Sequence, residues 1–246
     1  MSLLPQMVTH GVYYQRGKKQ MNLLNYKWWK QFLVGNYYEF VFRVVHKSKW
    51  KQVGSFKQRK FKDYKQYLKV QKAKINYTDL SEHSVLFYKR LNERIKSIQE
   101  IKEKGSVLCL GARDGIEVKA FRNNGFFAWG IDLKPSKNNE YVTTGDFHSI
   151  KLNDNSVDVI FTNSLDHSFD LDQVLEESAR VLKSDGILIV ECGTDGGYGL
   201  HESFMWKDVD TLINAISSQG FSILSKRNID YQQFSCVSLV FRNEVL

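Results

Sequence analysis

Two glycines and one aspartate have the residue types and the spacing of a nucleoside-binding site. Gly111 and Gly115 stand four positions apart, and Asp132 follows 17 positions after Gly115. Glycine lets the backbone approach a ligand closely, and a helix that begins at such a turn presents free backbone amides. A carboxylate at the end of the next strand can accept hydrogen bonds from ribose hydroxyls. The two glycines alone are weak evidence, because an ordinary strand-to-helix turn contains the same residues.

A second polar segment, Asn163–His167, supplies groups for proton transfer. It follows an apolar run and places Asp166 next to His167. Imidazole is the most frequent general base in enzymes, so His167 is the leading candidate to take a proton from an acceptor hydroxyl. The competing role for this histidine is to shape a ligand pocket.

A third segment, Gly193–Trp206, is rich in glycine and contains Tyr198 and His201. Loops at the carboxyl ends of strands bind substrate in α/β folds, so these two residues are candidate substrate contacts. A plain surface loop is the alternative. Neither the histidines nor the cysteines have the spacing of metal ligands, and we assign no metal. The cysteines lie in apolar runs and are expected in the core: Cys109, Cys192 and Cys236.

These segments require a parallel sheet to position them. From residue 104 onward, strand-like and helix-like segments alternate, which predicts a doubly wound α/β fold with helices on both faces. No helical segment separates the last two strands, and a parallel crossover needs a dozen or more residues. We therefore expect a seven-stranded, mostly parallel sheet that ends in an antiparallel pair at its edge. The predicted strands are Ser106–Leu110, Phe126–Ile131, Tyr141–Thr144, Val157–Thr162, Gly186–Val190, Phe221–Leu224 and Ser235–Phe241, and the predicted helices are Ile116–Asn123, Leu171–Leu182 and Val209–Ile216.

The first hundred residues differ in charge from the rest of the chain. Residues 1–104 contain 23 Lys and Arg against 7 Asp and Glu, whereas residues 105–246 contain 12 against 20. A contrast of this size indicates two parts with different roles. We therefore predict a basic, aromatic-rich and mainly helical N-terminal region, 1–78, followed by the α/β domain, 79–246. An amphipathic helix over Leu80–Ile101 leads into that domain and is expected to pack on it.

The segment Lys57–Lys74 concentrates this charge, with eight basic residues, one acidic residue and interleaved aromatics. It predicts a poorly buried helix that binds nucleic acid or an anionic membrane surface. A solvated charged helix is the alternative. The chain has no apolar run of the ~20 residues that a transmembrane helix needs. Without a secretory signal at the start, we expect a cytoplasmic protein, or one peripheral to a membrane.

Five segments in order resemble the motifs of the class I, Rossmann-like S-adenosylmethionine-dependent methyltransferases, in their small-molecule (type 11-like) branch. The resemblance extends from residue 104 towards the C-terminus, where the family also has an antiparallel pair of strands. The five segments are Val107–Gly115 (VLCLGARDG), Gly130–Leu133 (GIDL), Gly145–Phe147 (GDF), Asp158–His167 (DVIFTNSLDH) and Leu182–Leu188 (LKSDGIL).

The resemblance implies S-adenosylmethionine as cofactor and assigns roles to individual residues. Asn163–His167 would face the transferring methyl group, with Asp166 and His167 as the catalytic candidates. Two positions differ from the family pattern: Cys109 replaces an acidic residue and Arg113 replaces a glycine. Asp114 and Glu117 are candidates to restore the charge balance. The implied cofactor-binding residues are Gly111, Ala112, Asp114, Gly115, Asp132, Leu133, Gly145, Asp146, Phe147, Asn163 and Ser164.

Two functions remain open. The first is a methyltransferase that acts on a hydroxyl or carboxylate of a small-molecule, carbohydrate-like or anionic acceptor, because Asn163–Asp166 lacks the proline-proline-aromatic run with which family members hold a planar nitrogen. The second is a protein of the same fold that has lost catalysis and binds nucleic acid, a membrane or a protein partner through its basic region. A nicotinamide dinucleotide is a less favoured cofactor, since its pyrophosphate usually requires GxGxxG, which the turn does not have.

Overall fold

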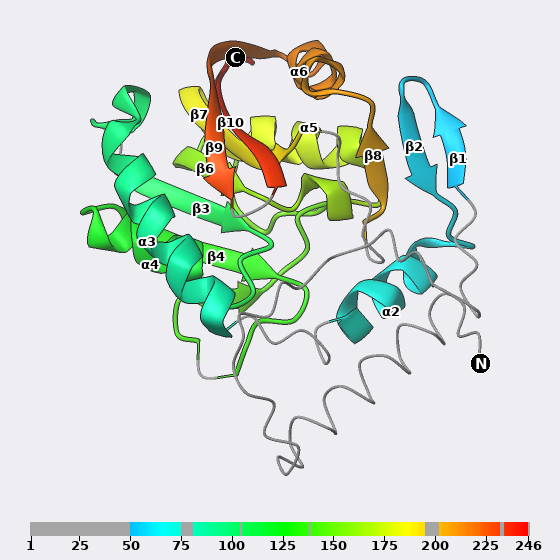
Figure 1. Cartoon of the computed structure of the whole chain (residues 1–246), viewed down its shortest axis with the longest axis horizontal. Coiled ribbons are helices and arrows are strands. Elements are labelled where there is room, and N and C mark those ends of the chain that lie inside the picture. Colours follow the sequence, from blue (N-terminus) through cyan, green and yellow to red (C-terminus); the bar gives the residue numbers. More distant parts are fainter. Residues whose placement is uncertain are drawn as a thin grey trace, which may run out of the picture. The chain divides into compact units, whose positions relative to one another are not determined.

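A mixed, mostly parallel sheet forms the centre of the described part of the chain. The structure is a computed structural model, and it describes residues 50–74, 81–103, 105–137, 139–194, 202–231 and 234–245. This sheet has seven strands in the order β5-β4-β3-β6-β7-β10-β9 (Figure 1). The strands are β3 (Ser106–Leu110), β4 (Phe127–Asp132), β5 (Val142–Thr144), β6 (Val157–Thr162), β7 (Leu182–Gly193), β9 (Phe221–Tyr231) and β10 (Phe234–Asn243).

The pairing of these strands confirms the predicted fold class. Strands β5, β4, β3, β6 and β7 pair in parallel, whereas β10 pairs antiparallel with both β7 and β9. The antiparallel pair at the sheet edge is therefore as predicted, with the last strand inserted between β7 and β9. Because β3 lies between β4 and β6, the chain reverses its direction of travel across the sheet at β3, and the crevice at the carboxyl ends there is the usual place for a ligand.

Helices cover both faces of the sheet because side chains alternate along each strand. In β3, Leu108 and Leu110 pack with α5 and α6, while Val107 and Cys109 pack with α3 and α4. Figure 1 shows α3 beside α4 on one side of the sheet. Among the helices that the structure describes, none is long and apolar enough to cross a bilayer. The main helices are α3 (Ser81–Ser97), α4 (Ile116–Asn123), α5 (Leu171–Val181) and α6 (Val209–Ser218).

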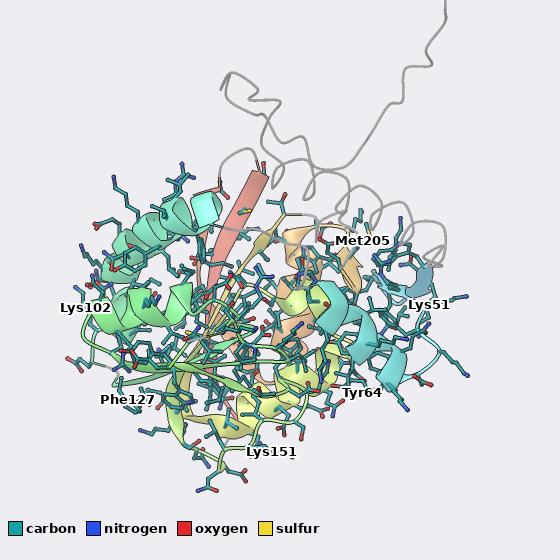
Figure 2. The ribbon with its side chains drawn as sticks, turned by 90° about the horizontal axis from the view of Figure 1, so that it is seen from below. Lys51, Tyr64, Lys102, Phe127, Lys151 and Met205 are labelled. Carbon is teal, nitrogen blue, oxygen red and sulfur yellow. The ribbon has the colours of Figure 1, made fainter. Side chains whose placement is uncertain are left out.

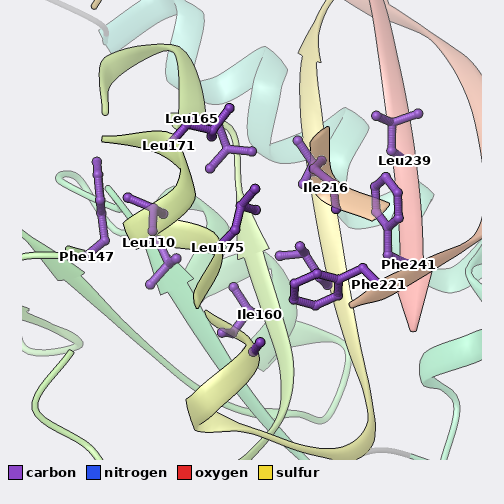
Figure 3. Packing of buried hydrophobic residues seen from close by; sticks show 14 of the residues in the cluster. Leu110, Phe147, Ile160, Leu165, Leu171, Leu175, Ile216, Phe221, Leu239 and Phe241 are labelled. Carbon is purple, nitrogen blue, oxygen red and sulfur yellow. The ribbon is translucent and has the colours of Figure 1, made fainter. Parts of the chain in front are cut away.

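The larger core lies under α5 and α6. Leu175 of α5 and Ile216 of α6 are fully buried against strand residues such as Ile160 (Figure 3). Asp170 and Asp208 cap the first turns of α5 and α6, accepting hydrogen bonds from the backbone N–H groups of Gln173 and Thr211. These aspartates start each helix at the residue where its apolar stripe begins, which is the usual role of an N-cap.

Helix α3 and the short helix η1 (Gln99–Ile101) lead into the sheet, as the amphipathic pattern over 80–101 predicts. Leu91, Ile95 and Ile101 are buried against Phe121 of α4 and Val107 of β3. Arg94 of α3 forms a two-point ion pair with Glu191 of β7, at 2.8 and 2.6 Å. The expectation that this helix packs on the α/β domain is confirmed.

A second, small antiparallel sheet has no counterpart among the predicted elements. It joins β1 (Trp50–Val53), β2 (Phe56–Arg59) and β8 (Phe204–Trp206), in that order. Figure 2 labels Lys51 on β1 and Met205 on β8. Arg59 anchors it, since its buried side chain donates to the carbonyl oxygen of Glu202 at 2.7 Å and its backbone N–H donates to that of Ser203 at 2.8 Å.

Helix α2 (Tyr64–Lys74) also departs from the sequence prediction. Lys57–Lys74 was expected to be one poorly buried helix, but its start is strand β2, and Tyr67 of α2 has no exposed surface. The reason is tertiary, because one face of α2 packs on residues that follow β5 and β6. Residues 50–74 belong to the same compact unit as the sheet. The division of the chain at residues 78 and 79 stays a prediction, because most of the first 78 residues lie outside the described ones.

Candidate active site

The glycine turn at the carboxyl end of β3 is held against β4. The backbone N–H groups of Gly111 and Ala112 both donate to the carbonyl oxygen of Ile131, at 2.9 and 3.2 Å. Gly111 and Gly115 have φ angles of 71° and 68°, a conformation that side chains disfavour. Gly115 is the residue from which helix α4 begins. The turn therefore requires glycine at both positions for its backbone conformation alone.

A side chain at either glycine would also meet a neighbour. A Cβ at Gly111 would lie 2.7 Å from Ser164 Oγ, and one at Gly115 would lie 2.6 Å from Asn139 Nδ2. The sequence pattern predicts these glycines where a ligand approaches the backbone closely. The structure adds a second reason for glycine at position 111. The turn after β3 packs closely against Ser164 in the segment after β6, which leaves no room for a Cβ.

Asp132 ends β4 beside this turn. Its Oδ2 accepts a hydrogen bond from the backbone N–H of Arg113 at 3.3 Å, and its Oδ1 accepts one from that of Lys134 at 2.7 Å. Both Asp132 and the adjacent Leu133 are half-buried. A carboxylate has about four lone-pair sites. Asp132 is thus oriented by the backbone at the end of β4, beside the glycine turn.

The guanidinium of Arg113 is balanced by the carboxylate next to it. Its Nε and terminal nitrogen lie 3.3 and 3.2 Å from Asp114 Oδ2. Asp114 also accepts a hydrogen bond from the hydroxyl of Ser136. The positive charge of Arg113 is therefore paired with Asp114 and adds no net positive charge to the glycine turn.

Glu117, in the first turn of α4, places a buried carboxylate at the end of β6. Only 8% of its surface is exposed, and its Oε1 accepts a hydrogen bond of 3.1 Å from Asn163 Nδ2. Burial raises the pKa of Glu117 to about 7, helped by Asp114 and Glu191 and opposed by the hydrogen bond from Asn163. Burial also raises the pKa of the Cys109 thiol, and the nearby Glu117 carboxylate adds to that rise. An acid thus lies beside Cys109, although it comes from helix α4.

The segment after β5 is part of the same edge of the sheet. The backbone N–H of Gly145 donates to the carbonyl oxygen of Asp132 at 2.9 Å. Phe147 and His148 are buried, with 9% and 2% of their surface exposed. The buried imidazole of His148 contacts the carboxylate of Asp146. Its Nδ1 lies 2.8 Å from Asp146 Oδ1.

The polar segment after β6 includes a short helix, η2 (Leu165–His167). Ser164 Oγ donates to Asn163 Oδ1 at 3.1 Å, next to the amide that contacts Glu117. His167 Nε2 lies 3.8 Å from Asp166 Oδ1, and about a fifth of each side chain is exposed. Both side chains are thus partly accessible, as a group that exchanges protons with an acceptor requires.

The structure brings the predicted cofactor residues together, since they follow the adjacent parallel strands β5, β4, β3 and β6. Tyr198 and His201, the predicted substrate contacts, lie outside the described residues. Within the described part of the chain, no group of histidine, cysteine and acidic side chains is arranged to hold a metal ion.

Two residues at this site were not recognised from the sequence, Tyr64 and Tyr67 of α2. The Tyr64 hydroxyl donates to Asp146, and the Tyr67 hydroxyl donates to the carbonyl oxygen of His167 at 3.0 Å. The sequence signal that could have identified them is the three-residue spacing of Phe61, Tyr64 and Tyr67. This spacing indicates a helix with one buried aromatic face. Because lysines surround them, the local composition indicates instead that these aromatics face a ligand.

Comparison with known proteins agrees with this architecture. Residues 108–190 match a family model described as a methyltransferase domain. The 1,6-didemethyltoxoflavin-N1-methyltransferase of Burkholderia thailandensis, solved with bound 1,6-didemethyltoxoflavin and S-adenosylhomocysteine, has a similar fold: TM-score 0.62, 12% identity, 80% of this chain and 100% of that chain covered. An S-adenosylmethionine-dependent methyltransferase of Clostridium acetobutylicum gives a TM-score of 0.51 at 12% identity, with 64% and 92% covered. No curated protein matches the sequence.

The family match and the fold likeness coincide at the site. The matched residues run from β3 to β7 and contain the glycine turn, Asp132, Asp146 and the segment after β6. Residues 108–190 are therefore similar to a methyltransferase domain, and the fold of the described chain is similar to that of an S-adenosylmethionine-dependent methyltransferase.

Proposed function

We propose that this protein transfers a methyl group from S-adenosylmethionine to a hydroxyl or carboxylate oxygen of a small-molecule, carbohydrate-like or anionic acceptor. The observation that carries the proposal is the joining of Asp132, the Gly111–Gly115 turn and the Asn163–Glu117 pair at one edge of the sheet. Together they offer an acceptor for ribose hydroxyls and an acid for a cationic group within one site.

The residues present fit the charge of the cofactor. Asp132 would hold the ribose, and Asp146 with Phe147 would flank the adenine. S-adenosylmethionine carries positive charge on its sulfonium and its amino group, and a buried carboxylate without a full counter-charge favours such a ligand. Glu117 is buried in this way, and the cation next to it in the turn, Arg113, is already paired with Asp114. The proposed cofactor contacts further include Gly111, Ala112, Asp114, Gly115, Leu133, Gly145, Asn163 and Ser164.

The cofactor supplies an electrophilic methyl group, and the acceptor oxygen must be aligned with it and free of its proton. Alignment contributes more to such a transfer than covalent catalysis by the protein. His167, with Asp166 beside it, would take the proton of an acceptor hydroxyl as general base. A carboxylate acceptor would need no base, so for it His167 would only position the acceptor. Tyr198 and His201 remain proposed substrate contacts.

Calorimetry with S-adenosylmethionine, S-adenosylhomocysteine and NAD tests the cofactor. Binding of the first two without NAD is the expected result, and binding of neither would overturn the proposal. Production of S-adenosylhomocysteine should then be measured with panels of hydroxyl, carboxylate and amine acceptors. Turnover confined to amines would overturn the proposed acceptor class. Cofactor binding without turnover on any panel would favour the alternative, a protein that has this fold but has lost catalysis.

The cationic face of α2 supports a second role, binding nucleic acid phosphate or an anionic membrane surface by charge. Tyr67 is fully buried, and Phe56, Phe61 and Tyr64 are half-buried in contacts within the protein, so base stacking by these aromatics is not part of the proposal. Lysines on β2, α2 and the loop between them are exposed: Lys57, Lys60, Lys62, Lys65, Lys69 and Lys72.

Salt dependence separates binding by charge from a merely solvated surface. RNA and anionic vesicles should each be titrated at several salt concentrations, since release of counterions makes affinity fall steeply with salt. Replacing Lys65, Lys69 and Lys72 with glutamine should reduce the affinity and flatten the salt dependence. Absence of binding to both ligands at low salt would leave these lysines as a solvated face.

A further inference from the structure

Helix α2 has two faces that differ in character. Lys65, Lys69 and Lys72 are exposed on one face, whereas Tyr67 and Val70 are buried on the other, with 0% and 7% of their surface exposed. Tyr64, on the buried side, is labelled on this helix in Figure 2. Both tyrosine hydroxyls make hydrogen bonds to residues of the candidate active site.

Tyr64 is connected to the segment after β5. Its hydroxyl donates to Asp146 Oδ2, and its oxygen lies 3.0 Å from His148 Nδ1. His148 Nε2 accepts from the backbone N–H of Phe169 at 2.9 Å, which places the ring proton on Nδ1. That proton is donated to Asp146 Oδ1 at 2.8 Å. Both oxygens of Asp146 are therefore fixed, one by the helix and one by the histidine.

The charge on Asp146 is a consequence of these contacts. Burial opposes ionisation of Asp146, but the hydrogen bonds from His148 and Tyr64 outweigh burial and lower its pKa. The carboxylate is thus held charged in one orientation. Removal of the Tyr64 hydroxyl would leave one of its oxygens without this donor and free the carboxylate to turn.

Tyr67 is connected to the segment after β6. Its hydroxyl donates to the carbonyl oxygen of His167 at 3.0 Å. Its ring lies among those of Phe61, His148 and Phe169, with centroids at 5.5, 5.6 and 5.4 Å. Burial raises the pKa of Tyr67, and the charges of Tyr64, Asp146 and Asp132 add to the rise.

From this geometry we propose that Tyr64 and Tyr67 are positioning residues of the methyltransferase site: Tyr64 orients Asp146 towards the cofactor adenine, and Tyr67 holds the backbone of His167 towards the acceptor. The inference rests on the proposed function. It makes helix α2 an integral part of the catalytic site, although it belongs to the basic part of the sequence.

The test uses the full chain with Tyr64→Phe and Tyr67→Phe, which remove one hydroxyl each and keep the ring. Tyr88→Phe on α3 is the matched control, because it removes the hydroxyl of a half-buried tyrosine that packs with the opposite core. Affinity for S-adenosylhomocysteine is measured by calorimetry. The imidazole signals of His148 and His167 are followed by nuclear magnetic resonance, and thermal unfolding reports stability.

We expect Tyr64→Phe to weaken S-adenosylhomocysteine binding at least 5-fold, and Tyr67→Phe to shift the His167 imidazole signals and their pH titration in the complex. Tyr88→Phe should do neither. Equal affinity for wild type and Tyr64→Phe, or unchanged His167 signals in Tyr67→Phe, would overturn the inference while the proposed function stands. Tighter binding by either variant would also overturn it, because α2 would then obstruct the site.

Failure of the proposed function has a different signature. If the wild-type chain binds neither S-adenosylmethionine nor S-adenosylhomocysteine, the proposed function fails and the inference fails with it. If Tyr67→Phe does not fold, Tyr67→Leu replaces it, and Tyr64→Phe serves as the folded reference. A Tyr67→Leu protein that folds and keeps wild-type His167 signals would equally contradict the role of the hydroxyl.

Discussion

The side-chain amide of Asn163 donates a hydrogen bond of 3.1 Å to the buried carboxylate of Glu117. It joins the end of β6 to the first turn of α4, two segments 46 positions apart in the sequence. The pKa of Glu117 is raised to about 7, mainly by burial. Ionisation of the buried Glu117 carboxylate therefore costs free energy at and above neutral pH. A cationic ligand beside the carboxylate would offset this cost.

Glu117→Gln should stabilise the protein above neutral pH. The folded-state pKa is raised above the ordinary value of 4.5, so the stability contributed by the neutral acid is present below pH 4.5 and is lost as pH rises through about 7. Glutamine removes that loss, and the gain at pH 8 is up to roughly 3 kcal/mol. Urea unfolding at pH 5 and pH 8 measures it. Glu176→Gln, an exposed change on α5, is the control.

The same variant should bind S-adenosylmethionine less tightly than wild type at pH 8. A charged acceptor is worth roughly 1.5–3 kcal/mol, which corresponds to about 10-fold or more in affinity. A stabilised protein with undiminished affinity would show that Glu117 does not face the cation.

Asp132→Ala should weaken binding of S-adenosylhomocysteine by about 10-fold or more, because it removes a charged acceptor from a half-buried site. Calorimetry measures the loss. Asp132→Asn should lose less, since its amide retains one acceptor oxygen for the backbone N–H groups of Arg113 and Lys134. Wild-type affinity in the alanine variant would place the ribose elsewhere.

Gly111→Ala should destabilise the turn through two separate effects. The φ angle of 71° costs an L-residue roughly 1–2 kcal/mol, and the new Cβ would meet Ser164. Combining Gly111→Ala with Ser164→Gly should recover the second part and leave the first. Urea unfolding of both single variants and the double variant gives this coupling. Simple additivity of the two changes would contradict the predicted contact.

His167→Ala should reduce turnover on a hydroxyl acceptor by roughly 100-fold or more, the contribution of a general base. Affinity for S-adenosylhomocysteine should change little. The comparison of the two measurements decides the role. Loss of cofactor affinity with normal turnover per bound cofactor would make His167 a pocket-shaping residue, and the base would then be sought at Tyr198 or His201.

Arg94→Met should destabilise the protein by about 3–5 kcal/mol, since it leaves the carboxylate of Glu191 buried without its partner. Burial raises the pKa of Glu191, and Arg94 opposes that rise. The double variant with Glu191→Leu should recover most of the loss. Equal instability of single and double variants would show that packing, rather than charge, links α3 to β7.

The sequence by itself determined the order and type of the elements that build the sheet. Apolar runs bounded by glycine or by short polar residues predicted β3, α4 and β6 with the residue bounds that the structure has. The absence of a helical segment between the last two strands predicted their antiparallel pairing. These features are local, since they depend on periodicity, turn residues and the length of connections.

Only the tertiary structure decided which distant residues meet. The sequence indicates Glu117 as a candidate counter-charge, but its burial and its contact with Asn163 depend on the crossover that places α4 beside the end of β6. Tyr64 and Tyr67 lie in a run of lysines, where local composition indicates a charged surface. They contact Asp146 and His167 because the aromatic face of α2 is buried at the edge of the sheet. The sequence periodicity of α2 does not reveal which residues far along the chain cover that face.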